Sequence, residues 1–241
     1  MTDAPRVAMV AGEISGDLLA GLLLDGLKAR WPGLASFGIG GARMAEQGFD
    51  AWWESERLAV HGYSAELLVR LAGIVRMRRQ LRARLLRHRP DVFVGVDAPD
   101  FNLGLEARLR AAGIRTAHFV CPSIWAWRPE RVEKIRAAAD HVLCLFPFEP
   151  ELLARHDIAA TFVGHPLASV IPLAPDRDGA RARLGLAPHD EVLAVLPGSR
   201  RAEVAYLASV FFQAAALVQQ ARQAIKIVVP AVPALRARIE A

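Results

Sequence analysis

The chain has 241 residues, 53% of them hydrophobic, and a formal net charge of +5 at pH 7. It is long enough to bury a large core in one large or two smaller domains, and its two cysteines, Cys121 and Cys144, lie in apolar runs that suit a reducing cytoplasm and exclude a disulfide framework. The amino terminus lacks the basic and apolar regions of a signal peptide, and no apolar run is unbroken for about 18 residues, so we expect neither a signal peptide nor a spanning helix.

Strands alternate with helices along the first two thirds of the chain. The expected strands are 6–11, 35–39, 92–96, 116–120, 141–146 and 161–163. Helical patterns separate them, among them a long one at about 66–89 and shorter ones at about 103–112, 130–139 and 150–156. This alternation predicts an α/β fold, with a Rossmann-like parallel sheet and helices on both faces.

A change in composition at 172–178 marks a boundary. We predict an N-terminal Rossmann-like domain over 1–172, a linker over 173–190 and the start of a second Rossmann-like domain over 191–241. The second domain shows one strand–helix–strand unit. Such a unit cannot bury both faces of a sheet, so we expect this domain to be incomplete.

The most informative segment is 91–102, DVFVGVDAPDFN. Its apolar strand stops at Asp97, and Pro99, Asp100 and Asn102 follow. The carboxyl ends of parallel strands open onto the ligand crevice, so Asp97 can face a substrate, while Pro99 fixes the direction of the chain. Alternatively, Asp97 or Asp100 only caps the following helix. The segment alone leaves both interpretations open.

The first expected strand ends in Gly12-Glu13-Ile14-Ser15-Gly16-Asp17. Glycines allow a close approach of ligand to backbone, and the amino terminus of a helix favours anions. No phosphate-binding glycine motif is present, however, and two acids would repel a phosphate. A hydroxyl-rich ligand such as a sugar suits Glu13, Ser15 and Asp17 better, although an ordinary turn capped by Ser15 and Asp17 remains the alternative.

Two further strand ends carry candidate ligand residues. Ser123, Trp125 and Trp127 follow one strand, and His165 follows another. The tryptophans can stack on a sugar ring or clasp a neighbouring domain, or they can plug the core. Histidine can donate a hydrogen bond or act as an acid, but a packing histidine is the commoner case.

The turn Leu196-Pro197-Gly198-Ser199-Arg200-Arg201 opens the helix of the second domain. Amides at a helix start combined with an arginine fork predict a diphosphate site at Gly198, Ser199 and Arg200. The alternative is an N-cap with solvated arginines. The sequence contains no CxxC or HxxxH motif and no cluster of His and Asp residues, so we expect no metal site.

The segment 67–90 contains eight arginines and no acid, so the rest of the chain carries 5 − 8 = −3. A basic helix with exposed apolar residues is typical of binding to an anionic membrane surface. A plain surface helix and a nucleic-acid site are the alternatives, and the run has no aromatic residues for base stacking. The residues expected at the membrane are Leu67, Leu68, Leu71, Ile74, Val75, Arg76, Arg78, Arg79 and Arg82.

Five motifs in one order carry a resemblance to a known family. They are 11–17 (AGEISGD), 94–102 (VGVDAPDFN), 122–127 (PSIWAW), 162–166 (FVGHP) and 196–200 (LPGSR). Together they resemble the lipid-A-disaccharide synthases, family 19 of the glycosyltransferases, and they span most of the chain.

The resemblance implies a two-domain GT-B fold and an inverting transfer without metal or cofactor. The expected substrates are UDP-2,3-diacylglucosamine and 2,3-diacylglucosamine 1-phosphate, which give the lipid A disaccharide 1-phosphate and UDP. Asp97 would be the base, and Arg200 and the amides of Gly198 and Ser199 would hold the diphosphate. Asn102, Glu13 and Ser15 would position sugar hydroxyls. The residues expected to bind the substrates are Glu13, Ser15, Asp17, Asp100, Asn102, Ser123, Trp125, Trp127 and His165.

The resemblance also implies a cytoplasmic enzyme that is peripheral on the inner membrane, with no nucleic-acid partner. A serine-glycine-threonine segment of the family, which is expected to hold the nucleotide, has no match in this sequence. The alternatives are another UDP-sugar GT-B enzyme, such as a 2-epimerase, and an inactive membrane-binding fragment.

Overall fold

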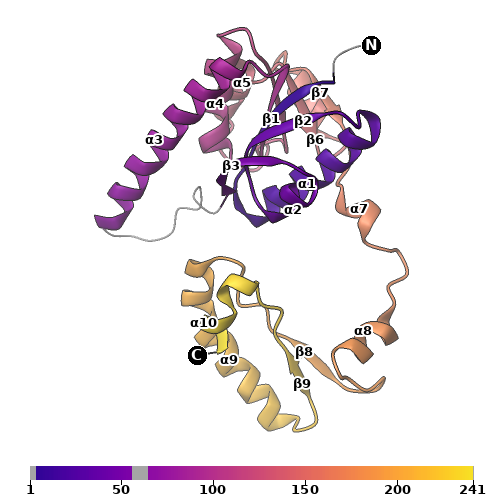
Figure 1. Ribbon diagram of the computed structural model, residues 1–241. Coiled ribbons are helices and arrows are strands. Elements are labelled where there is room, and N and C mark those ends of the chain that lie inside the picture. Colours follow the sequence, from indigo (N-terminus) through magenta and orange to yellow (C-terminus); the bar gives the residue numbers. More distant parts are fainter. Residues whose placement is uncertain (1–3, 56–64, 241) are drawn as a thin grey trace. The chain divides into compact units, whose positions relative to one another are not determined.

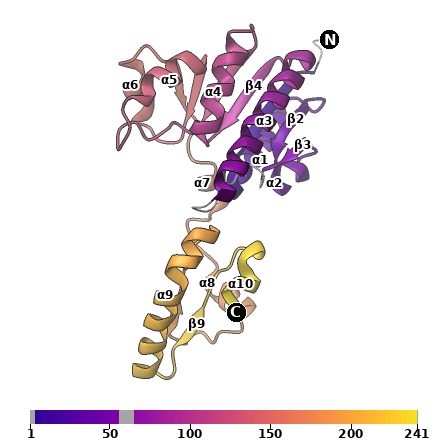
Figure 2. The ribbon, with the colours of Figure 1, turned by 90° about the vertical axis from the view of Figure 1, so that its left-hand side faces the viewer.

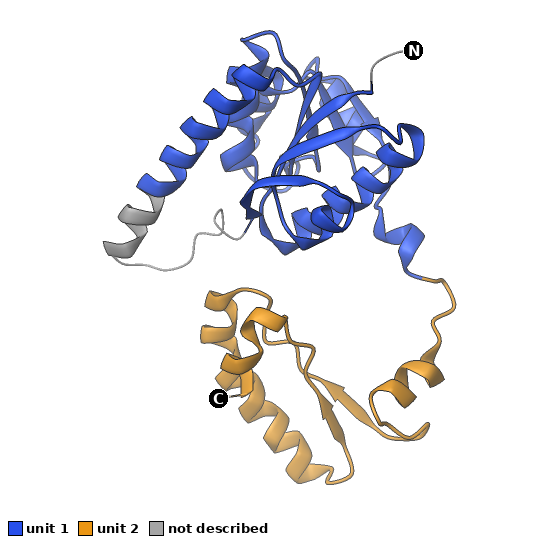
Figure 3. Ribbon diagram, in the orientation of Figure 1, with its two compact units in different colours: residues 1–60, 64–171 blue, residues 61–63, 172–241 orange. Residues whose placement is uncertain are grey.

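The computed structural model describes residues 4–55 and 65–240, and the side chains of all of these except 65–71 (Figure 1). The chain forms two compact units that divide between Ile171 and Pro172 (Figure 3). The division lies within one residue of the predicted end of the first domain.

Unit 1 is built on one parallel sheet with the strand order β3-β2-β1-β4-β5-β6-β7. Its strands are β1 (Arg6–Ala11), β2 (Ala35–Gly40), β3 (Asp50–Glu54), β4 (Val92–Val96), β5 (Arg115–Phe119), β6 (His141–Cys144) and β7 (Ala160–Phe162). The sequence did not predict β3, because this largely exposed edge strand has an apolar run of only three residues, 51–53, between two acids. The other strands lie where the sequence predicts them.

Helices cover both faces of this sheet, as predicted (Figure 1). The helices of unit 1 are α1 (Glu13–Arg30), α2 (Ala42–Glu46), α3 (Ala65–His88), α4 (Pro99–Arg110), α5 (Arg131–Ala138), α6 (Glu149–Ala154) and α7 (Leu167–Val170), of which α7 has no buried residue.

Side chains that alternate along β1 divide the core into two layers. Met9 packs in the layer that contains Leu24 of α1, whereas Val10 packs in the layer that contains Leu81 of α3 and Leu105 of α4. Figures 1 and 2 show α3 beside α4. The near-continuous apolar strands follow from burial on both faces.

Unit 2 contains the predicted strand–helix–strand unit. Its elements are α8 (Arg177–Arg183), β8 (Val192–Ala194), α9 (Arg201–Ala221), β9 (Lys226–Val228), a 3₁₀ turn at Pro233–Leu235 and α10 (Arg236–Glu240). β8 and β9 pair in parallel. The range 173–190 is not a plain linker, because it contains α8, from which Arg181 donates to the carbonyl oxygens of Ala187 and Asp190.

Helix α9 is the one described helix that is long and apolar enough to cross a membrane by length and composition. It also connects two adjacent parallel strands, β8 and β9. Two parallel neighbours need a crossover connection of this kind, which is usually a helix. Within this helix only Val204 and Ala215 are buried, whereas Tyr206, Val210 and Leu217 are exposed.

Candidate functional site

The strand order of unit 1 reverses between β1 and β4. From β1 the chain proceeds through β2 and β3 towards one edge, and from β4 it proceeds through β5 to β7 towards the other. In open α/β sheets, ligands bind outside the carboxyl ends of the strands at such a switch point. The register pairs Ala11 with Val96, so Gly12 and Asp97 leave the sheet side by side at this point.

Asp97 lies in a strained turn. Its φ is 51° and that of Ala98 is 42°, both in the left-handed region that residues other than glycine rarely adopt. The N-cap of α4 is Ala98, and no side chain caps this helix. The interpretation of Asp97 or Asp100 as a helix cap is therefore wrong. Backbone strain of this kind is concentrated at functional sites.

Asn102 holds this turn in place. Its side chain is fully buried, and Nδ2 donates to the carbonyl oxygens of Asp97 at 2.8 Å, Val10 at 3.3 Å and Val96 at 3.4 Å. The amide therefore ties the ends of β1 and β4 together. This geometry gives Asn102 a positioning role in place of the sugar contact expected from the sequence.

The turn after β1 is built differently from the sequence interpretation. Helix α1 begins at Glu13, whose φ is 58°, and no side chain caps it. Ser15 is exposed. The buried carboxylate of Asp17 accepts from the backbone N–H groups of Gly41 at 2.7 Å, Arg43 at 2.9 Å and Met44 at 3.3 Å. Asp17 thus anchors the start of α2, which corrects both its assignment as a ligand residue and its assignment as a cap of α1.

The tryptophans after β5 lie on the surface. Trp125 and Trp127 are 50% and 55% exposed, so they do not plug the core. Ser123 is exposed in the same loop. The rings of Trp125 and Phe148 meet edge to face with centroids 5.3 Å apart, and Phe148 stacks on Phe146. An exposed aromatic group of this kind at the carboxyl edge of the sheet suits a sugar or acyl ligand.

Two arginines in this region were missed by the sequence analysis. Nη2 of Arg131 lies 2.7 and 2.9 Å from the two carboxylate oxygens of Asp100, and Nη1 of Arg128 lies 4.0 Å from Oδ1 of Asp100. The guanidinium carbons of Arg128 and Arg131 lie 4.5 and 5.3 Å from the ring centroid of Trp127. The motif PSIWAWR ends on Arg128, and that sequence signal could have identified it.

His165 follows β7 at the same edge of the sheet. Its Nδ1 accepts from the N–H of Leu167 at 3.3 Å, so the ring caps the start of α7 while it stays partly exposed. Gly164 before it has a φ of 78° and makes the turn possible.

Beneath the aromatic residues, Cys121, Cys144 and Glu149 gather with their ligand atoms within 4.8 Å of one another. Both cysteines are free. The hydrogen bond with Cys144, together with burial, raises the pKa of Cys121, which keeps the thiol protonated. Burial also raises the pKa of Glu149, whose carboxylate accepts from the N–H of Phe146 and from the side chain of Trp125. Glu149 therefore ties the side chain of Trp125 to the backbone of Phe146.

The turn 197–200 of unit 2 presents amides, as predicted, but a carboxylate already accepts from them. The N–H groups of Ser199 and Arg200 donate to Oε2 of Glu203 at 2.9 and 3.1 Å, and Nη1 of Arg200 lies 3.2 Å from Oε1. The amide of Ser199, followed by that of Arg200, lowers the pKa of Glu203. Gly198 has a φ of 122°, and a Cβ there would lie 2.4 Å from Cβ of Glu203. A phosphate would have to take the place of this carboxylate.

The basic helix α3 has one face in the core and one exposed stripe. Met77, Leu81 and Leu85 are buried, and Ile74 packs partly against them. Val75, Arg79, Arg82 and Leu86 are exposed at helical spacing on one stripe, and Arg76 is exposed beside it. Burial, then Arg108 and Arg79, lowers the pKa of the partly buried Arg78. The side chains of Leu67, Leu68 and Leu71 lie outside the described residues.

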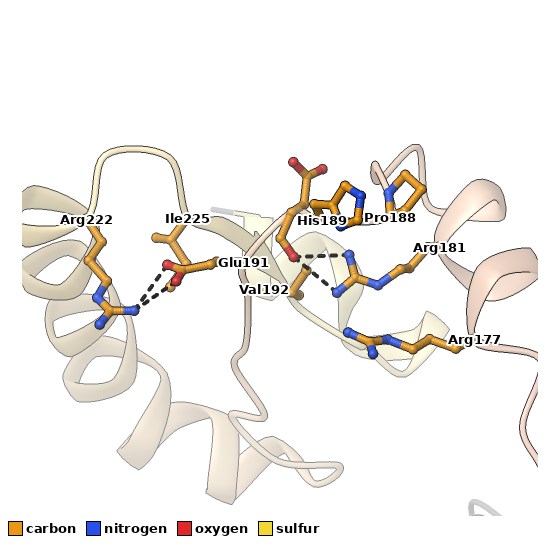
Figure 4. A pocket seen from close by; sticks show the side chains of 9 residues that line it. Arg177, Arg181, Pro188, His189, Glu191, Val192, Arg222 and Ile225 are labelled. Carbon is orange, nitrogen blue, oxygen red and sulfur yellow. Dashed lines mark hydrogen bonds and ion pairs between the residues drawn. The ribbon is translucent and has the colours of Figure 1, made fainter.

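Unit 2 has a polar hollow at the end of its two-stranded sheet that lies opposite the turn 197–200 (Figure 4). It is lined by Arg177, Arg181, Pro188, His189, Asp190, Glu191, Val192, Arg222 and Ile225. Arg222 pairs with Glu191, and Arg181 donates to the carbonyl oxygen of Asp190. Val192 begins β8 and Ile225 precedes β9, so the hollow lies at the amino ends of the strands, whereas ligands of open α/β sheets bind at the carboxyl ends.

A profile of the family described as lipid-A-disaccharide synthetase matches residues 7–241. The lipid-A-disaccharide synthase of Verminephrobacter eiseniae is 67% identical over 234 residues, which are 97% of this chain and 60% of that protein. That of Albidiferax ferrireducens is 66% identical over 98% of this chain and 60% of that protein. The chain therefore spans about 60% of the length of these relatives.

Solved structures with the same fold have little sequence in common with this chain. A co-structure of S. aureus MnaA with UDP has a TM-score of 0.63 at 10% identity and covers 97% of this chain and 64% of its own. The UDP-GlcNAc 2-epimerase of Neisseria meningitidis bound to UDP-GlcNAc has a TM-score of 0.61 at 11% identity, with 97% and 67% covered. This likeness concerns the fold, and the predicted GT-B-like α/β fold class is confirmed.

Proposed function

This chain belongs to the lipid-A-disaccharide synthase family, and from that premise we propose that it carries the catalytic base and part of the donor-phosphate site of a glycosyltransferase. The reaction moves 2,3-diacylglucosamine from its UDP conjugate to 2,3-diacylglucosamine 1-phosphate. The products are the lipid A disaccharide 1-phosphate and UDP.

The placement of Asp97 is the observation that carries the proposal. This carboxylate leaves β4 at the switch point of the sheet, beside the turn with Glu13 and Ser15. Its backbone strain is held by the buried amide of Asn102. A base must be fixed relative to the hydroxyl group that it deprotonates, and a strained, tied turn provides this fixation.

In the proposed reaction, Asp97 takes the proton from the 6-hydroxyl of the acceptor as this oxygen attacks the anomeric carbon of the donor. The bond between that carbon and the UDP oxygen breaks, and the configuration inverts. Donors at the turn of unit 2 then meet the negative charge on the departing diphosphate: the amides of Ser199 and Arg200 and the guanidinium of Arg200. For this to happen, Glu203 must release these groups to the phosphate.

The exposed stripe of α3 supports an attachment to an anionic membrane surface. Val75 and Leu86 provide apolar contact, and Arg76, Arg79 and Arg82 provide positive charge. This pairing of apolar and basic residues is the requirement for interfacial binding. The attachment would bring the enzyme to its acylated substrates on the cytoplasmic side of the inner membrane.

The test is a radiolabelled disaccharide assay with diacylated substrates, run on this chain and on a fusion that continues after residue 241 with the remainder of the V. eiseniae relative. We expect Asp97→Asn to lower the turnover by about 10²- to 10⁴-fold, the range for loss of a general base. Asp25→Asn, which changes an exposed acid of α1, is the control. Turnover by Asp97→Asn equal to that of the control would exclude Asp97 as the base.

The same assay separates the proposal from a 2-epimerase activity, which the solved structures of this fold include. An epimerase converts plain UDP-GlcNAc without an acceptor. Conversion of this sugar by the fusion, without disaccharide from the diacylated pair, would favour the epimerase.

A further inference from the structure

Arg128 and Arg131 share one acid at the carboxyl edge of the unit 1 sheet. The Arg131 side chain is only 9% exposed and contacts both carboxylate oxygens of Asp100. The Arg128 side chain is 47% exposed, and its nearer nitrogen lies 4.0 Å from the same carboxylate. The three side chains together carry one positive charge in excess, and the half-exposed guanidinium of Arg128 presents it to solvent.

Trp127 fixes the direction of these guanidinium groups. Both lie over its ring, at 4.5 Å for Arg128 and 5.3 Å for Arg131. A guanidinium stacked on an aromatic face keeps its N–H donors at its edges, where they are available to a ligand. Arginine held in this way matches the oxygens of a phosphate, which it can contact through two parallel hydrogen bonds.

The backbone of Arg128 is strained as well. Its φ is 55°, in the left-handed region. A residue other than glycine stays in this region only where its surroundings compensate for the strain. Here the strain places a cation beside an exposed aromatic ring, which points to a ligand with both a negative charge and an apolar or sugar surface.

The cluster lies one strand away from Asp97. Val96, the last residue of β4, pairs with Phe119, the last residue of β5, so Asp97 and the loop that carries Arg128 leave neighbouring strands. Asp100, which orients Arg131, is in the first turn of the helix that follows Asp97. An anion bound here would therefore lie on the same edge of the sheet as the proposed base.

We propose that Arg128, with Arg131, Asp100 and Trp127, forms the subsite for the phosphate monoester of the acceptor sugar. This inference rests on the proposed function and deepens it. The acceptor carries its reacting hydroxyl and its phosphate on one sugar ring, so a single loop beside Asp97 can hold the phosphate while Asp97 meets the hydroxyl. The diphosphate of the donor is assigned to the turn 197–200, so the two phosphate groups have separate sites.

The experiment is a calorimetric titration of this chain with glucosamine 1-phosphate. Parallel titrations use glucosamine, inorganic phosphate and UDP. We expect glucosamine 1-phosphate to bind more tightly than glucosamine, and Arg128→Gln to weaken its binding about 10- to 100-fold, the range for loss of a charged hydrogen bond. Arg128→Lys keeps the charge and should lose less, and UDP binding should be the same in all variants.

Arg155→Gln is the matched control, because Arg155 is an exposed arginine that pairs with Glu151 on α6. Circular dichroism confirms that each variant is folded. Equal affinity of the wild type and Arg128→Gln for glucosamine 1-phosphate would overturn the subsite, and so would equal affinity of the wild type for glucosamine with and without phosphate. An equal loss of UDP binding in Arg128→Gln would assign the arginine to the donor instead.

This titration needs no turnover, so its outcome is independent of the disaccharide assay. In the fusion, Arg128→Gln should raise the KM for the acceptor and leave the KM for the donor unchanged. If the fusion makes disaccharide and the acceptor KM of Arg128→Gln equals that of the wild type, the subsite is wrong while the proposed function stands.

Discussion

Replacement of Asn102 by alanine should destabilise unit 1 and at the same time release the turn that carries Asp97. The variant removes the donor of one hydrogen bond at 2.8 Å to Asp97 and two longer ones at 3.3 and 3.4 Å to Val10 and Val96. It leaves the carbonyl oxygen of Asp97 without this buried partner. We expect a loss of about 2–4 kcal/mol, since a net hydrogen bond contributes about 0.5–1.5 kcal/mol and an unsatisfied buried group costs about 1–3 kcal/mol.

The measurement is urea unfolding followed by circular dichroism, with Asn102→Asp as a second variant of nearly the same shape. A carboxylate at this position would face the three carbonyl oxygens and repel them, so Asn102→Asp should be at least as destabilised as the alanine variant at pH 7. Its deficit relative to the wild type should shrink as the pH falls and the carboxyl group takes up a proton, because the O–H can then donate.

A purely ligand-binding Asn102 would behave differently. Unfolding midpoints of both variants equal to that of the wild type would refute the positioning role, and the residue would return to the set of sugar contacts. A large loss of stability together with a pH-independent deficit for Asn102→Asp would refute the assignment of the amide as a donor to these carbonyl oxygens.

Two further predictions concern α3 and unit 2. Leu81→Ala, at a fully buried position, should lower the unfolding free energy by about 2–5 kcal/mol. Leu86→Ala, on the exposed stripe, should change the stability little and instead weaken sedimentation with anionic vesicles. The opposite result would mean that Leu86 lies in the core and Leu81 on the membrane-facing side of α3. The lowered pKa of Glu203 means that its stabilisation of unit 2 is present above its unfolded pKa and is lost as the pH falls through its folded pKa. Glu203→Gln should therefore have a lower thermal unfolding midpoint than the wild type at pH 7, and the two midpoints should approach each other in acid. A difference between the midpoints that does not change with pH would contradict stabilisation by the ionised carboxylate of Glu203.

Strand ends are the part of the site that sequence can reveal. The apolar run before Asp97 predicts a buried parallel strand, and the carboxyl end of such a strand is where a polar side chain can meet a ligand. The same reasoning located the loop with Trp125 and Trp127, and the structure adds that these rings are exposed. Uninterrupted apolar runs also located most of the strands, because a strand that is buried on both faces has apolar side chains on both faces.

Long-range partners are the part that sequence does not reveal. Asp17 is an unremarkable acid in a helical pattern until α2, 24 residues later, offers its amides. The sequence pattern likewise suggests that Arg131 is a solvated residue of α5, but its side chain is buried and contacts Asp100, 31 residues earlier. The edge strand β3 lacked a signal because its apolar run has only three residues between two acids.

Both phosphate sites proposed for this chain contain a carboxylate of the chain itself. Glu203 accepts hydrogen bonds from the amides of the turn 197–200, and Asp100 pairs with Arg131. The two acids differ in what a phosphate must do. At the turn, the carboxylate of Glu203 accepts hydrogen bonds from both amides. A phosphate must therefore replace this carboxylate, and competition from Glu203 should weaken phosphate binding. At Asp100, the second guanidinium leaves a positive charge unmatched, so a phosphate adds to the ion pair without breaking it. Phosphate binding at the donor site is therefore expected to depend on the ionisation of Glu203, whereas binding at the acceptor site is not expected to depend on that of Asp100.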